Sequence, residues 1–156
     1  MHKRIRLFVA IACIMTAACN DAPTEAGRKD GFGDTPVSKE DSLHHAVMEG
    51  HDVGMAKIGR LRKCIGQLQQ REDSIGKLPV AKQDKQYLQA LSSLKADLAA
   101  ADKGMNTWME EYKDDSAKGN EPLRPQYLES EKVKVTLVKD QILGALNRAD
   151  SLLKQP

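Results

Sequence analysis

The sequence predicts an all-α fold, an up-down-up antiparallel three-helix bundle with coiled-coil-like packing. Three observations predict it. Apolar residues recur at alternating steps of three and four over three long segments, helix-breaking residues separate these segments, and strand-like alternation is absent from the sequence. Helices joined by short connections pack antiparallel to their neighbours. We therefore expect one domain over residues 38–156, with helices at about 38–75, 80–113 and 124–154.

The first predicted helix begins with a capping signal. Ser38 can accept a hydrogen bond from a free backbone amide, and Glu40 and Asp41 suit the positive end of a helix dipole. The pattern ends near Gly76, three residues before a proline. The expected core positions are Val47, His51, Gly54, Ile58, Leu61, Ile65 and Leu68.

The second and third predicted helices carry cleaner apolar repeats. Pro125 suits the first turn of the third helix, and one charged residue, Glu131, interrupts the repeat of that helix. The expected core positions of the second helix are Tyr87, Leu91, Leu94, Leu98, Ala101, Met105, Trp108 and Tyr112. Those of the third are Leu128, Glu131, Val135, Val138, Ile142, Ala145, Ala149 and Leu152.

The first 18 residues have the composition of a secretory signal. A cationic start precedes a short apolar run that ends in small residues, and the run is too short to span a membrane. Cys19 follows directly, as in the lipobox of bacterial lipoproteins, although Thr16 stands where the lipobox usually has Leu. We expect cleavage before Cys19, acylation of its thiol and amino group, and a flexible tether over 19–37. A plain secreted protein is the alternative.

The expected processing changes charge and cysteine content. The formal charge of +2 loses three positive residues, Lys3, Arg4 and Arg6, and becomes −1, which gives little support to nucleic-acid binding. Cys13 would leave with the signal and Cys19 would be acylated. Cys64 would remain as one free thiol, expected beside the core and inert.

One layer of the predicted bundle is unusual. Antiparallel pairing places His51 roughly level with Met105 and Glu131, and a buried histidine could pair with Glu131 and fix the helix register. Small residues beside His51 would let another helix approach closely or leave a depression. We favour this structural interpretation, with no metal or other cofactor. The alternative is a soft-metal site for Cu(I), built from Met48, His51 and Met55, which share one helix face.

Several residue groups resemble one family. They are His51-Asp52-x-x-Met55, Met105-x-x-Trp108-Met109-x-x-Tyr112-Lys113, and Tyr127-Leu128-x-x-Glu131-x-x-Lys134-Val135. Together with the lipobox cysteine they resemble short bacterial lipoproteins often labelled "viral A-type inclusion protein", over about residues 43–153. The resemblance implies no established activity. It implies an interaction surface at the end of the bundle that holds His51, Asp52, Trp108 and Glu131.

The sequence thus favours a lipid-anchored helical bundle of the cell envelope that docks an envelope protein. The outer membrane is preferred, because Asn20 rather than Asp follows the cysteine. A copper-binding envelope protein is the second hypothesis. An enzyme is the weakest, since His51 and Glu131 could exchange protons but no nucleophile or phosphate loop accompanies them in the sequence.

Overall fold

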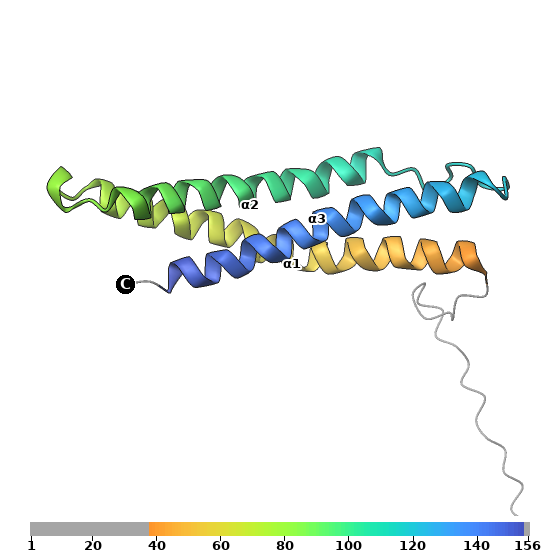
Figure 1. Ribbon diagram of the computed structural model, residues 1–156, viewed down its shortest axis with the longest axis horizontal. Coiled ribbons are helices and arrows are strands. Elements are labelled where there is room, and N and C mark those ends of the chain that lie inside the picture. The colour runs from red at the N-terminus through yellow and green to blue at the C-terminus, as the bar shows by residue number, and fades with distance from the viewer. Residues whose placement is uncertain (1–37, 155–156) are drawn as a thin grey trace, which may run out of the picture. The chain divides into compact units, whose positions relative to one another are not determined.

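The computed structural model describes residues 38–154, which form a three-helix bundle (Figure 1). The helices are α1 (Lys39–Gly76), α2 (Lys85–Glu111) and α3 (Leu123–Leu153), with a short 3₁₀ helix, η1 (Val80–Lys82), between the first two. α2 runs antiparallel to α1 and α3 in Figure 1, so the predicted up-down-up bundle is confirmed. The predicted signal peptide, Cys19 and the tether lie outside the described residues.

Side-chain capping explains where α1 and α2 begin. Ser38 accepts a hydrogen bond of 3.0 Å from the Asp41 amide, as predicted. The second helix was expected from residue 80 but begins at Lys85. The reason is that Asp84 caps it, accepting from the Tyr87 amide at 3.0 Å, while Val80–Lys82 forms η1 after Pro79.

The core of α1 differs from the predicted heptad at two places. Gly50 is buried where His51 was expected, and Cys64 is buried where Ile65 was expected. The predicted and observed positions coincide again at Gly54 and at Leu68, so both departures are local shifts of one residue on the same helix face. At the first, Gly50 faces Val135 of α3, and at the second, Ile65 is partly buried beside the core. In α2 the predicted buried positions are confirmed from Leu91 to Trp108.

Two glycines of α1 allow close helix packing. The sequence predicted either this close packing or a depression at the small residues beside His51. A Cβ atom on Gly50 would lie 3.0 Å from Cγ1 of Val135 in α3. A Cβ atom on Gly54 would lie 2.4 Å from Cε of Met105 in α2. Real Cβ contacts are rarely this short, so both neighbours occupy space that a side chain would need. The Cα atom of Lys139 in α3 would also lie 3.9 Å from a Cβ atom on Gly54, so α1 approaches the α3 backbone closely near His51, while the end of the Met105 side chain fills the space beside Gly54.

Buried Cys64 is the free thiol of the described residues. Burial raises the pKa of its thiol, which disfavours the reactive thiolate. Residues 38–154 also contain no helix with an apolar stretch long enough to cross a bilayer.

Candidate functional site

The bundle end at which α1 and α3 begin and α2 ends carries a row of aromatic rings. Trp108 is buried in α2 and stacks on Tyr112 with ring centroids 4.9 Å apart. Tyr112 stacks on Tyr127 of α3 at 6.2 Å, and His51 of α1 lies 5.6 Å from Trp108 on the other side. We call these four residues the aromatic row. It connects all three helices at this end.

Glu131 is buried beside the row, and both of its carboxylate oxygens have partners. The indole Nε1 of Trp108 donates a hydrogen bond of 3.0 Å to Oε2. The ammonium group of Lys134 donates one of 2.8 Å to Oε1, and this bond raises the pKa of Lys134. A buried carboxylate needs such partners to offset its lost hydration. Glu131 thus links α3 to α2.

The predicted pairing of His51 with Glu131 is wrong, because His51 has other partners. Its Nδ1 lies 2.8 Å from Oδ1 of Asp52, the next residue in α1. Its Nε2 lies 3.3 Å from the thioether sulfur of Met109 in α2. The side chain is 20 % exposed, so the ring lies at the edge of the core rather than in it.

Asp114 connects the segment after α2 to α1. Its Oδ1 lies 2.8 Å from Nε2 of His44 and accepts a hydrogen bond of 3.1 Å from the Tyr112 hydroxyl. Partial burial acts to raise the pKa of Asp114, but the hydrogen bonds with His44 and Tyr112 outweigh it and hold this pKa below its ordinary value. Burial, followed by the charge of Asp114, raises the pKa of the Tyr112 phenol.

Arg124 is a buried residue that the sequence analysis missed. Its Nε donates a hydrogen bond of 3.0 Å to Glu40 of α1, and its NH1 group donates one of 3.0 Å to the carbonyl of Ser116. Its guanidinium carbon also lies 6.0 Å from the centre of the Tyr127 ring. Glu40 lies far away in the sequence and Ser116 lies in the linker before α3, so no helical pattern around Arg124 distinguishes it from a surface arginine.

The predicted interaction residues therefore come together at one end but differ in accessibility. Trp108 and Glu131 are buried and hydrogen-bonded to each other. Asp52 is exposed, and His51 is partly exposed. At this end His51 and Asp52 are accessible to solvent, whereas the hydrogen bond between Trp108 and Glu131 connects α2 to α3.

The predicted metal ligands Met48, His51 and Met55 all lie in α1. Met48 is half-buried and Met55 is 38 % exposed, and the thioether found against His51 is that of Met109. Residues 38–154 contain no group of three or more His, Cys, Asp or Glu side chains that could hold a metal ion. Methionine is not among those residue types.

A shallow groove of about 440 Å³ runs between α2 and α3. Its α2 side combines small residues with Trp108 and two charged residues, and its α3 side holds Leu137 and Val138 beside Lys134. Leu137 is 59 % exposed. Val133, one turn earlier in α3, is 66 % exposed. The lining consists of Ala100, Lys103, Gly104, Thr107, Trp108, Glu111, Lys134, Leu137 and Val138. This groove was not predicted, because only Trp108 and Val138 of its lining are heptad positions and the other residues lie outside the repeat.

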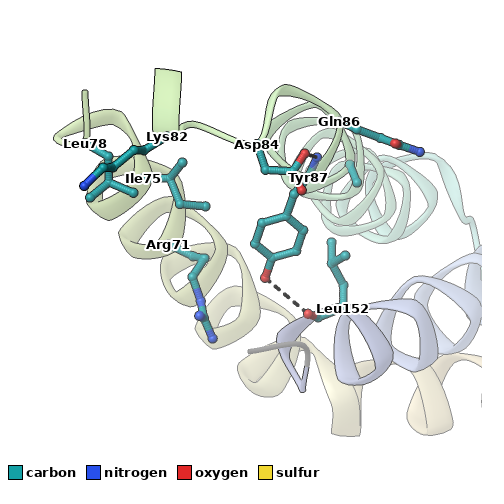
Figure 2. A pocket seen from close by; sticks show the side chains of 9 residues that line it. Arg71, Ile75, Leu78, Lys82, Asp84, Gln86, Tyr87 and Leu152 are labelled. Atoms are coloured by element: carbon teal, nitrogen blue, oxygen red, sulfur yellow. Dashed lines mark hydrogen bonds between the residues drawn. The ribbon is translucent and has the colours of Figure 1, made fainter. Parts of the chain in front are cut away.

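A second hollow of about 660 Å³ lies at the opposite end, where α1 ends and α2 begins (Figure 2). Arg71 and Lys82 bring positive charge to it, and Tyr87 crosses it to donate a hydrogen bond of 3.3 Å to the Leu152 carbonyl. Ile75 and Leu78 add apolar surface. The hollow borders η1, the segment in which the sequence analysis expected the second helix to begin.

Comparison of the chain with known protein families, with curated proteins and with solved structures gives no match in any of the three. The resemblance to the inclusion-protein-labelled lipoproteins stays a prediction. Arguments about function therefore rest on the residues and geometry described above.

Proposed function

We propose that this chain is a lipid-anchored, non-enzymatic helical bundle of the bacterial cell envelope. In this proposal it docks a helical segment of another envelope protein in the groove between α2 and α3. The outer membrane is the preferred location. The observation that carries the docking proposal is the groove itself, with Leu137 more than half exposed on its wall.

The groove has the features of a surface that receives a helix. Ala100 and Gly104 lie one turn apart in α2, and small residues at this spacing let a second helix backbone approach closely. Leu137 and Val133 would bury apolar surface, at roughly 25 cal/mol per Å² removed from water. A fourth helix in this position would complete a four-helix bundle.

The charges around the groove indicate what kind of helix fits. Lys103 and Lys134 line it together with one acidic residue, Glu111, and Lys134 is already paired with buried Glu131. A partner helix with an apolar stripe beside an acidic residue would complement both the groove and Lys103. The proposed partner is thus an acidic amphipathic helix of a membrane or periplasmic protein.

The anchoring part of the proposal rests on the sequence before the bundle. A cationic start, a short apolar run and Cys19 after small residues support a lipoprotein signal. Several acyl chains would give lasting membrane residence, whereas one chain gives only marginal binding. We expect Cys19→Ser to block both signal cleavage and fatty-acid labelling. A Cys19→Ser protein that is processed and labelled like the unaltered chain would contradict the anchor.

Site-specific photo-crosslinking tests the docking proposal in intact cells. A photoreactive amino acid at Leu137 should give a discrete crosslinked product, and the crosslinked peptide should belong to an acidic amphipathic helix. The matched control is Gln67, which is exposed on α1 and outside the groove. Equal crosslinking from both positions, or none from Leu137, would overturn the proposal. Loss of the product in the Cys19→Ser variant would tie docking to the anchor.

A further inference from the structure

We propose that His51 and Met109 form a binding site for Cu(I). The inference goes beyond the proposed docking function, because it concerns the contact between α1 and α2 rather than the groove between α2 and α3. It starts from two donor atoms on different helices, Nε2 of His51 and Sδ of Met109, which lie 3.3 Å apart.

The hydrogen bonding of the imidazole leaves a lone pair at this contact. Nδ1 of His51 lies 2.8 Å from Oδ1 of Asp52, so one tautomer of the neutral ring donates from Nδ1 to this carboxylate. In that tautomer Nε2 carries a lone pair, and it faces a thioether sulfur, which also carries lone pairs and no hydrogen. A cation bound between Nε2 and the sulfur would satisfy both atoms.

The donor types and their arrangement select a soft ion. Thioether and imidazole ligands suit Cu(I), while hard ions such as Mg²⁺ prefer oxygen. Metal-binding histidines usually donate their other ring N–H to a carboxylate, which is the role that Asp52 takes here. For zinc, bonds of about 2.0 Å to imidazole nitrogen and about 2.3 Å to sulfur place two ligands of one ion roughly 3–4 Å apart, and we take the same range as a guide for Cu(I). The observed separation lies in this range.

The position of the pair allows an ion to enter and to be detected. Met109 is 37 % exposed and the His51 side chain is 20 % exposed, so the donors border solvent and a small external ligand can complete the coordination. Trp108, the single tryptophan of the chain, lies 5.6 Å from the His51 ring. Its fluorescence therefore reports on ion binding at this pair.

Anaerobic titration with Cu(I) against a chromogenic chelator tests the proposal on the full mature chain. All variants carry Cys19→Ser and Cys64→Ala, because a free thiol at either position is itself a soft ligand. We expect one equivalent of Cu(I) with quenching of Trp108 fluorescence. Met109→Leu and His51→Gln should each weaken binding at least tenfold. Met55→Leu is the matched control, because it removes an exposed thioether that the sequence predicted as a Cu(I) ligand; Met55 is 38 % exposed. The Cu(I) affinity of this variant should stay within twofold of that of the unaltered site.

Circular dichroism excludes unfolding as an explanation, because each variant should show unchanged helix content. A separate measurement tests whether Asp52 only orients the ring: Asp52→Asn should weaken Cu(I) binding less than His51→Gln does. Absence of stoichiometric Cu(I) binding would overturn the proposal. Equal losses in the Met55→Leu and Met109→Leu variants, or binding that survives Met109→Leu, would also overturn it.

Discussion

Glu131 is a charged residue in the core, and its two partners explain why it can lie there. The Trp108 indole and the Lys134 ammonium group each donate to one carboxylate oxygen. Removing one partner of a buried carboxylate lowers the free energy of unfolding by far more than the hydrogen bond contributes, because water does not replace the lost partner. Interactions at this single residue therefore couple α2 to α3.

Trp108→Phe should reveal this coupling. The phenyl ring keeps most of the packing but removes the N–H that donates to Glu131. We expect a loss of about 1.5–3 kcal/mol in the free energy of unfolding, measured by urea denaturation. In the Glu131→Gln background the same change should cost at least about 0.5 kcal/mol less, because the acceptor is then neutral. Strictly additive effects would show that the two side chains act independently.

Asp114 should make the bundle sensitive to acid. Its pKa is lower in the folded chain than in the unfolded chain, so its stabilising contribution is complete above the ordinary aspartate pKa of about 3.9. That contribution is lost as the pH falls through the lower, folded pKa. When the pH is lowered from 6 to the acid range, the Asp114→Asn variant should therefore lose less thermal stability than the unaltered chain. Thermal unfolding at the two pH values measures this loss. An identical pH dependence of the two proteins would refute the assignment.

At the scale of the helices, glycine position determines whether a side chain is tolerated. Gly54 lies against the terminal methyl of fully buried Met105, whereas a Cβ atom on Gly66 would have no neighbouring atom within 4 Å. Both glycines are inside α1, and each lowers helix stability relative to alanine. The same substitution should therefore have different effects at the two positions.

Gly66→Ala should raise the free energy of unfolding by about 0.5–1 kcal/mol, as expected for an exposed helix interior. Gly54→Ala should gain less or lose stability, because its methyl group would displace Met105 in a packed core. Urea denaturation of both variants, analysed together, checks the difference. Equal gains would show that α1 and α2 are not held as closely as described.

At the scale of the whole bundle, one core connects the three helices, and ion pairs between helices lie around it. Arg62 pairs with Asp102 at 2.9 Å between α1 and α2, and Arg148 pairs with Asp97 at 3.1 Å between α2 and α3. Exposed pairs of this kind each contribute roughly 0–1 kcal/mol. Stability therefore depends mainly on the shared apolar core, and the bundle should unfold as one unit.

Leu98→Asp tests this dependence. Leu98 is fully buried in the middle of α2, and an unpaired carboxylate there should destabilise the bundle by several kcal/mol, about 3–5. The neighbouring substitution Ala99→Asp, on the exposed face, should change stability by no more than about 0.5 kcal/mol. Far-ultraviolet circular dichroism during urea denaturation measures both. Similar effects of the two substitutions would contradict the three-helix core.

The sequence by itself determined the helices and their order. Apolar spacing, the Ser38 cap and Pro125 are local features, and local features suffice to predict where chain segments form helices and which general face is buried. The gathering of His51, Trp108 and Glu131 at one end also followed from helix length and antiparallel pairing. Heptad counting went wrong by one residue at Gly50 and Cys64, because the rotation of α1 against its neighbours decides which of two adjacent positions is buried.

The tertiary structure alone decided which side chains meet. His51 and Glu131 were expected to pair, but the ring contacts Met109 and the carboxylate contacts Trp108. Arg124 is buried because Glu40 and Ser116 come to it from other segments. Such contacts depend on helix rotation and on the path of the linker. A shift of one residue turns a side chain by about 100°, so spacing along the sequence cannot specify individual partners.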